Sequence, residues 1–174
     1  MNSDSAIDFQ AHGKYLRLLR ESGWEYVDRV GVTGIVAMIP VTDDGKIVLI
    51  EQFRAPVGKR VVEIPAGLVG DQPGSETPAL AAKRELLEET GYKARRMKKV
   101  TEGPPSAGLS TEVVTFYLAT GLTKVEDGGG DGSEDIEIHE VPLDDIDNWL
   151  KRRAKGRYID PKVYTGLYFA KTVN

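Results

Sequence analysis

Short runs of apolar and β-branched residues recur along the chain and predict that β-strands make up much of the structure. The runs occupy residues 32–41, 47–53, 60–64, 97–101, 112–119 and 136–141. Between the first two runs, Asp44-Gly45 is a strong turn signal. Two further runs within residues 14–30 are separated by Arg20-Glu21-Ser22-Gly23, and they predict an N-terminal β-hairpin.

Three segments have helical spacing instead, at residues 78–90, 143–153 and 162–171. The first has the clearest limits, because Thr77 suits an N-cap, Pro78 the first helical position and Gly91 the residue after the end. One internal helix and two C-terminal helices among many strands predict an α+β fold, not the regular alternation of a doubly wound sheet.

Composition limits the classes of function. The chain has 174 residues, which predicts one domain over residues 14–174 after a flexible N-terminal tail at residues 1–13. A net charge of −4 argues against nucleic acid as a partner. The absence of cysteine excludes disulfides and thiolate chemistry. With no leader-like N-terminus and no apolar run long enough for a bilayer, we expect a cytoplasmic protein without a membrane partner.

Three glutamates crowd one face of the first helix. Glu85, Glu88 and Glu89 stand at positions i, i+3 and i+4. At a separation of ~6 Å and an effective dielectric constant near 20, each pair repels by about 3 kcal/mol. A divalent cation would remove that repulsion, and carboxylate oxygens favour magnesium, calcium or manganese. The alternative is a solvated acidic face.

The residues around these glutamates have a recognisable spacing. Gly70, five residues, Glu76, seven residues, Arg84-Glu85-Leu86, one residue, Glu88-Glu89, one residue and Gly91-Tyr92 together resemble the Nudix hydrolase signature. Only Tyr92 stands where that family more often has an aliphatic residue. The resemblance implies an α/β/α sandwich around a mixed β-sheet. It also implies hydrolysis of a nucleoside diphosphate linked to another group, with Mg²⁺ as cofactor and Mn²⁺ as a possible substitute.

The same resemblance implies a role for each residue of the signature. Glu85 and Glu89 would be the principal metal ligands, Glu88 would bind a further ion or its water, and the Ala66 carbonyl would complete the site. Arg84, counted with Glu88 among the catalytic residues, would hold the carboxylates in place. For Arg84 a plain supporting ion pair describes nearly the same role.

Other segments are similar to the ADP-ribose and nucleotide-sugar pyrophosphatase branch of the family, notably residues 51–54 and 63–68. In that branch Arg54 would contact the diphosphate, Trp24 and Tyr15 would stack on the base, and Arg29 would reach the phosphates from a partner subunit. The alternatives are a surface role for Arg54 and ordinary packing of both aromatic residues in a hairpin or dimer interface.

A hydrolase also needs a group that accepts a proton from the attacking water. Residues 132–136 resemble the loop that carries this group in the branch, and Glu134 is the matching position. The alternative is a solvated acidic loop, because several other acids lie in residues 126–137. The two histidines, His12 and His139, lie outside every matched position and are given no role.

Substrate choice is the least determined property. ADP-ribose-specific members carry a proline just before Gly-Leu-Ser, where this chain has Ala107. We therefore expect a homodimeric nucleoside diphosphate sugar hydrolase that acts on substrates such as ADP-ribose, GDP-mannose and ADP-glucose. The alternatives are a dedicated ADP-ribose pyrophosphatase and, from another class, a Nudix module that binds a nucleotide without catalysis.

Overall fold

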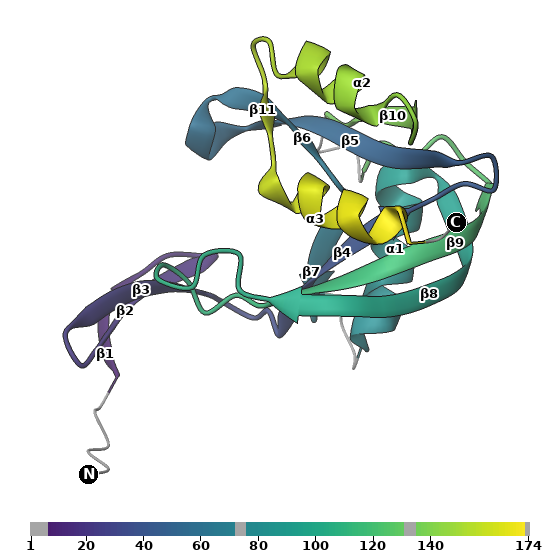
Figure 1. Cartoon of the computed structure of the whole chain (residues 1–174). Coiled ribbons are helices and arrows are strands. Elements are labelled where there is room, and N and C mark those ends of the chain that lie inside the picture. The colour runs from purple at the N-terminus through teal and green to yellow at the C-terminus, as the bar shows by residue number, and fades with distance from the viewer. Residues whose placement is uncertain (1–6, 72–75, 131–134, 173–174) are drawn as a thin grey trace.

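Two four-stranded sheets form the body of the protein in the computed structural model, which describes residues 7–71, 76–130 and 135–172 (Figure 1). One sheet has the order β7-β4-β9-β8 and the other the order β10-β5-β6-β11. Within each sheet one neighbouring pair is parallel, β4–β9 and β6–β11, and the other pairs are antiparallel. Both sheets are therefore mixed, as expected.

The first sheet consists of β4 (Gly34–Pro40), β7 (Ala66–Val69), β8 (Tyr92–Gly103) and β9 (Val114–Lys124). The second consists of β5 (Lys46–Arg54), β6 (Lys59–Glu63), β10 (Glu137–Pro142) and β11 (Tyr158–Ile159). A short 3₁₀ helix, η1 (Ala55–Val57), links β5 to β6. The α-helices are α1 (Pro78–Thr90), α2 (Ile146–Arg153) and α3 (Pro161–Ala170).

Alternating side chains of β4 join two separate cores. Val36 and Met38 pack in the cluster that includes Leu86 of α1, while Ala37 and Ile39 pack in the cluster that includes α3. Because successive residues of a strand face opposite sides, α1 and α3 must cover opposite faces of this sheet, and Figure 1 shows them there. The predicted α+β class and the sandwich of helices around a mixed sheet are confirmed.

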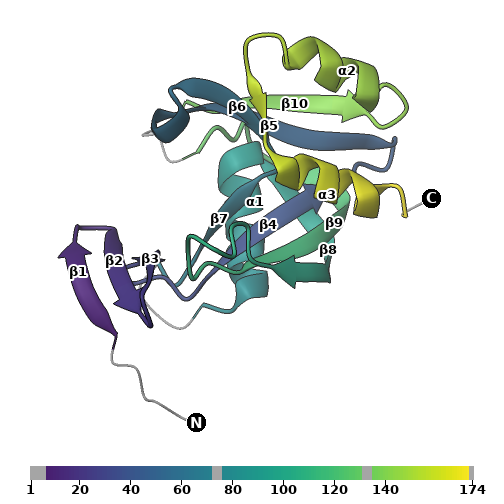
Figure 2. The ribbon, with the colours of Figure 1, turned by 60° about the vertical axis from the view of Figure 1, so that its left-hand side comes forward.

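A third sheet, β1-β2-β3, stands away from the body at the N-terminal end (Figures 1 and 2). Its strands β2 (Leu16–Glu21) and β3 (Trp24–Arg29) form the predicted hairpin. Ser22 and Gly23 have φ values of 52° and 82°, as the tightest hairpin turns require. The loop before β9 joins this sheet to the body, because Val27 N donates to Leu109 O at 2.8 Å.

The prediction of a flexible tail over residues 1–13 is wrong for β1 (Asp8–His12), which pairs with β2. All five β1 side chains are exposed, so pairing of its backbone with β2, and not burial of one face, holds the strand. Two other short strands, β7 and β11, were not predicted. The helix predicted from residue 143 begins only at Ile146, because residues 143–145 form a turn. No helix in the described parts of the chain combines the length and apolar character needed to cross a membrane.

Candidate functional site

Helix α1 carries the predicted carboxylates and has the predicted ends. The Thr77 side chain accepts a hydrogen bond from Leu80 N, and Gly91, with a φ of 73°, donates its N–H to Leu87 O at 2.7 Å. The buried residues of the helix are Ala81, Ala82, Leu86, Glu89 and Thr90. The carboxylate face is therefore graded, with Glu89 buried, the Glu85 side chain 12% exposed and the Glu88 side chain 43% exposed.

Strand β7 receives the two inward carboxylates. Ala66 N donates to Glu89 Oε2 at 3.0 Å. Glu85 lies so close to the next residue that a Cβ added at Gly67 would stand 1.9 Å from Glu85 Cδ. Burial raises the pKa of Glu85 above its usual range, although the neighbouring Arg84 opposes the shift. Burial thus disfavours the charged form of Glu85 more than Arg84 favours it.

Arg84 connects four carboxylates. Its Nε donates to Glu76 at 3.1 Å, its Nη1 to Glu85 at 2.9 Å and Glu88 at 3.0 Å, and its Nη2 to Asp71 at 3.1 Å. The hydrogen bonds to Glu76, with the charges of Glu85 and Asp71, raise the pKa of the guanidinium further above its usual value. This arrangement matches the supporting role expected of Arg84.

These side chains border a cavity of about 490 Å³. Its lining includes seven of the predicted site residues: Arg29, Arg54, Ala66, Arg84, Glu85, Glu88 and Glu89. It also includes residues to which the sequence gave no role: Glu63, Pro105, Glu112, Gly130 and Lys162. Strands β3, β5 and β7 and helices α1 and α3 all contribute, so the fold gathers residues that are distant in sequence.

Two arginines enter the cavity with carboxylate partners that the sequence did not reveal. Arg54 Nε donates to Glu63 Oε2 at 2.8 Å, and the arginine side chain is 43% exposed. Arg29 donates through Nε and Nη2 to Glu112 Oε1 at 2.9 and 2.7 Å. Glu63 was within a matched segment, but Glu112 lies 83 positions from Arg29 and carries no local signal.

The two aromatic residues predicted to stack on a base are absent from the described lining of this cavity. Trp24 is 62% exposed and donates Nε1–H to Gly108 O at 3.2 Å, and Tyr15 is 64% exposed beneath Lys14 Nζ. Trp24 therefore contacts the loop that contains Ala107, and Pro105 of that loop reaches the cavity. The structure thus links Trp24 to the cavity through this loop, and Tyr15 contacts Lys14.

The glycine-rich segment before Glu134 docks on the end of α1. Gly129 N donates to Glu89 O and Gly130 N to Glu88 O, both at 3.0 Å. A Cβ at Gly128 would lie 2.5 Å from Gly91 N, so only glycine permits this approach. Glu134 itself lies outside the described residues. Asp135 follows it and accepts a hydrogen bond from Arg60 Nη1 at 2.7 Å.

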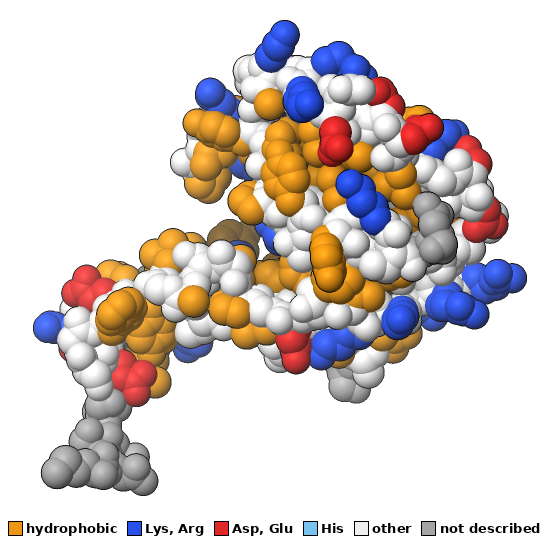
Figure 3. All heavy atoms as spheres, viewed as in Figure 1, with side chains coloured by type: hydrophobic (Ala, Val, Ile, Leu, Met, Phe, Trp, Pro, Cys, Tyr) orange, Lys and Arg blue, Asp and Glu red, His pale blue; other side chains and the backbone are white. Residues whose placement is uncertain are grey.

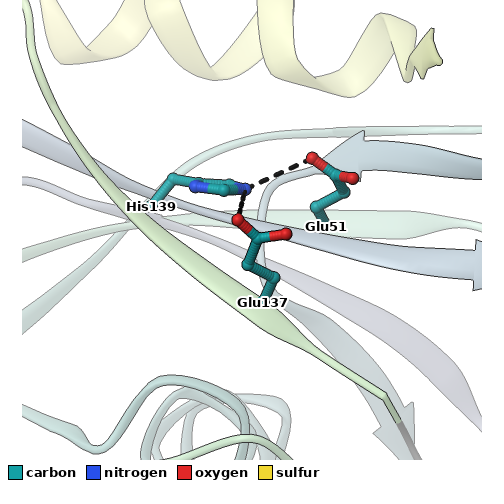
Figure 4. A group of neighbouring side chains, drawn as sticks. All are labelled: Glu51, Glu137 and His139. Carbon is teal, nitrogen blue, oxygen red and sulfur yellow. Dashed lines mark hydrogen bonds and ion pairs between the residues drawn. The ribbon is translucent and has the colours of Figure 1, made fainter. Parts of the chain in front are cut away.

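The oxygen donors of Glu85, Glu88, Glu89 and Ala66 suit a hard divalent cation. Burial disfavours the negative charge of the Glu85 carboxyl, and a bound cation would offset that cost. In the described parts of the chain, however, only Glu51, Glu137 and His139 place ligand atoms within 4.8 Å of one another (Figure 4). The three α1 glutamates do not meet this criterion; Arg84 Nη1 bonds to both Glu85 and Glu88, and Ala66 N bonds to Glu89.

The Glu51 group has the wrong charges for a metal centre. Glu51 is fully buried, with Arg157 Nε at 2.5 Å, Arg60 Nε at 3.0 Å and Arg153 Nη1 at 3.6 Å from its carboxylate oxygens. Burial disfavours its charge, but the hydrogen bonds from Arg157 and Arg60 hold the pKa of Glu51 below its usual range. A cation placed there would face three guanidinium groups, so we interpret the group as an ion-pair network.

Comparison with known proteins settles the family. The model of the NUDIX domain matches residues 32–164. The chain belongs to the Nudix family. This match covers both sheets of the body, α1 and the start of α3, and it confirms the resemblance seen in the α1 signature.

Named relatives give the family context. The methanol dehydrogenase activator of Bacillus methanolicus is 39% identical over 137 residues, which cover 78% of this chain and 71% of that protein. The ADP-ribose pyrophosphatase of Bacillus subtilis (strain 168) is 43% identical over 113 residues, or 64% of this chain and 60% of that protein. The GDP-mannose pyrophosphatase of Yersinia pestis (strain Pestoides F) is 33% identical over 146 residues, or 79% and 70%.

A solved structure supports the architecture. The crystal structure of an ADP compounds hydrolase superposes with a TM-score of 0.65 at 21% identity, and the match covers 84% of this chain and 80% of the other. At that identity the likeness concerns the fold. The predicted Nudix fold is confirmed.

Proposed function

We propose that this Nudix protein hydrolyses the diphosphate bond of nucleoside diphosphate sugars to a nucleoside monophosphate and a sugar phosphate. The observation that carries the proposal is one cavity that holds three glutamates of α1 together with Arg54 of β5. Two relatives, from Bacillus subtilis and Yersinia pestis, are named as pyrophosphatases of ADP-ribose and GDP-mannose, which supports this class of substrate.

We assign the metal site to Glu85, Glu88, Glu89 and the Ala66 carbonyl, with Mg²⁺ as the ion. When bound, the ion would neutralise charge on the diphosphate as water attacks phosphorus. The chain's own part is to hold the carboxylates ready. Ala66 N fixes Glu89, Gly67 leaves room for Glu85, and Arg84 bonds to Glu85 and Glu88.

Arg54 would bind the diphosphate itself. Its Nε is held by Glu63, which orients the side chain, and a planar guanidinium gives paired hydrogen bonds to phosphate oxygens. Glu134 is our candidate for the general base. Its neighbours support this assignment, because Gly130 lines the cavity and Asp135 is bound to Arg60.

We further propose a homodimer in which Trp24 and Tyr15 serve the partner's site, whereas Arg29, which the resemblance also assigned to the partner's phosphates, lines the cavity of its own chain. Figure 3 shows hydrophobic side chains gathered on the N-terminal sheet that projects from the body. Those exposed there include Phe9, Tyr15, Leu16 and Trp24. Light scattering should give twice the mass of the chain, whereas a monomer at micromolar concentration would remove the role of these residues in trans.

A second candidate function is suggested by the Bacillus methanolicus relative, which is named as an activator of another enzyme. A Nudix chain in that role could bind a nucleotide without hydrolysing it. Retention of the buried Glu89 and of the bonds from Arg84 to Glu85 and Glu88 favours hydrolysis, because a binding module does not need these carboxylates.

The deciding experiment measures turnover of ADP-ribose, GDP-mannose, ADP-glucose and UDP-glucose with Mg²⁺ and a coupled phosphatase. Turnover of several of them supports a broad nucleotide-sugar hydrolase, turnover of ADP-ribose alone supports the dedicated enzyme, and turnover of none contradicts the proposal.

Variants then test the assignments. Glu89→Gln should lower kcat by about a hundredfold or more while the fold persists, because the amide oxygen can still accept from Ala66 N. Asp147→Asn, the same chemical change at an exposed position of α2, is the control and should keep wild-type kcat. If Glu134→Gln keeps the wild-type kcat, the general base is not Glu134 and the role passes to another acidic residue.

A further inference from the structure

Lys162 lies in the first turn of α3 and lines the cavity that holds the α1 glutamates. Its side chain is only 25% exposed. The sequence offered no signal for it, since the residue lies more than 70 positions after Glu89 and outside every matched motif. A partly buried ammonium in a cavity lined by many carboxylates calls for a physical explanation.

Asp160, two residues before this lysine, holds it in place. One Asp160 oxygen accepts the backbone N–H of Lys162 at 2.7 Å and caps the helix, and the other pairs with Lys162 Nζ. Among the described residues Asp160 lines an adjoining hollow, whereas Lys162 lines the cavity itself. An ammonium group has three N–H donors, and among the described residues its acceptor is Asp160. Donors are therefore left that a ligand oxygen could accept from.

Lys162 also lies near Arg54. Arg54, Glu63, Asp160 and Pro161 together border an adjoining, more apolar hollow, while Arg54, Glu63 and Lys162 share the main cavity. The Arg54–Glu63 pair and the first turn of α3 therefore meet at the boundary between the two spaces. The main cavity therefore holds a second cation besides the arginine assigned to the diphosphate.

The charge balance of the cavity makes such a cation important. The lining has six acidic residues, Glu63, Asp71, Glu85, Glu88, Glu89 and Glu112, against four basic ones, Arg29, Arg54, Arg84 and Lys162. Arg84 is committed to four carboxylates, and Arg29 gives both Nε and Nη2 to Glu112. A diphosphate entering this field would depend most on Arg54, whose bond to Glu63 uses Nε, and on Lys162, whose partner Asp160 lies outside the described lining of this cavity.

We propose that Lys162 is a second phosphate-binding residue, whose ammonium contacts a diphosphate oxygen alongside Arg54. This inference rests on the proposed function, because it names a further contact to the same substrate. Lysine suits the position because its charge has no fixed plane and can follow an oxygen while Asp160 holds the side chain. The contact would act on binding, not on the chemical step.

The test compares Lys162→Met, Lys162→Gln and Lys162→Arg with Lys171→Met, an exposed lysine just after the same helix. For ADP-ribose with Mg²⁺, the Met and Gln variants should raise KM by about tenfold or more, the size expected for one charge-assisted hydrogen bond, and leave kcat within about threefold. Lys162→Arg should recover most of the loss, and Lys171→Met should match wild type.

A second measurement separates this inference from the proposed function. Calorimetric titration with inorganic pyrophosphate, in buffer without magnesium, should show the same loss of affinity in Lys162→Gln. Suppose that the wild-type protein hydrolyses no nucleotide sugar, but that Lys162→Gln binds pyrophosphate more weakly than wild type does. The proposed function then fails and the phosphate contact of Lys162 stands. Unchanged KM and unchanged pyrophosphate affinity in folded Met and Gln variants would overturn the role of Lys162.

Discussion

Gly67 illustrates how one residue without a side chain sets the position of another. A Cβ at this position would overlap Glu85 Cγ, Cδ and Oε1, all within 2.2 Å. The overlapping atoms are the end of a flexible side chain and not backbone, so an alanine can be accommodated if the carboxyl moves away. The substitution should therefore weaken metal binding more than it lowers the stability of the fold.

We expect Gly67→Ala to raise the Mg²⁺ concentration needed for half-maximal activity by about tenfold, because Glu85 can no longer occupy its place beside β7. The melting temperature should change by only a few degrees. A magnesium titration of the hydrolysis rate, with circular dichroism melting, checks both expectations.

Gly103→Ala is the matched control, because a Cβ there meets nothing within 4 Å. It should leave the magnesium requirement unchanged. An equal requirement in both variants would show that the Gly67 contact does not set the position of the Glu85 carboxyl.

The sequence predicted residues best where chemistry follows from local spacing. Glu85, Glu88, Glu89 and Arg84 share one helix, so their positions relative to one another follow from helical geometry, and the structure gathers them as expected. Glu112 and Lys162 join the cavity only through the packing of distant elements. No periodicity in one sequence encodes such a meeting.

At the scale of elements, residues 126–130 dock on the end of α1. Val125 N also donates, to Gly91 O at 2.9 Å, so the segment meets the last turn of α1 at several points. Gly128, with a φ of 74°, packs against the backbone of Thr90 and Gly91. Backbone cannot yield as a side chain can, so this contact should be intolerant of substitution.

Gly128→Ala should therefore lower both thermal stability and kcat, the latter by about tenfold or more, because the loop must lift from the carbonyls of Glu88 and Glu89. Gly129→Ala provides the comparison. Gly129 also has a positive φ, of 107°, but a Cβ there meets nothing within 4 Å. Both variants share the strain of the left-handed region, and only Gly128→Ala adds the clash.

Melting temperature and kcat measured on the two variants give the answer. The difference between them isolates the docking contact from backbone strain. If Gly129→Ala loses as much kcat as Gly128→Ala, strain alone accounts for the effect and docking has no part in it.

Elements were predicted well when their ends or side-chain patterns were strong. Thr77, Gly91 and the Asp44-Gly45 turn fixed α1 and the β4–β5 connection. Strands β1, β7 and β11 were missed because they have only two to five residues, too few for a side-chain pattern to identify a strand. Tyr92, unusual for the family, is explained by its position, where its hydroxyl donates to Glu140 at 2.5 Å across to β10.

At the scale of the whole molecule, the Glu51 network ties the second sheet to its surroundings. Glu51 of β5 meets Arg60 of β6, His139 of β10 and Arg153 of α2, and Arg157 just before β11. The His139 ring lies against Trp149 of α2 with centroids 5.1 Å apart. Burial and the nearby Arg153 lower the pKa of His139 below its usual 6.5.

This shift predicts a loss of stability in acid. With a folded pKa below 6.5, the unfolded chain takes up the His139 proton first. The free energy of unfolding should therefore fall as pH drops below about 6.5, until the folded form is protonated as well. Urea unfolding at pH 7 and pH 5.5 measures the change.

His139→Asn should reduce that pH dependence, and His12→Asn, on the exposed strand β1, should leave it as in wild type. These are the two histidines of the chain. An equal slope in wild type and His139→Asn would assign the acid sensitivity to carboxylates instead.

The charges around Arg84 should also affect the stability of the protein during purification. A single guanidinium stands against Asp71, Glu76, Glu85 and Glu88, so without a divalent ion the folded state keeps uncompensated negative charge that unfolding would disperse. An ion that binds only the folded chain then acts as a thermodynamic ligand of folding. Preparations exposed to chelators should melt at a lower temperature and regain it when magnesium is restored. The metal ion would thus contribute to the thermal stability of the protein as well as to its catalysis.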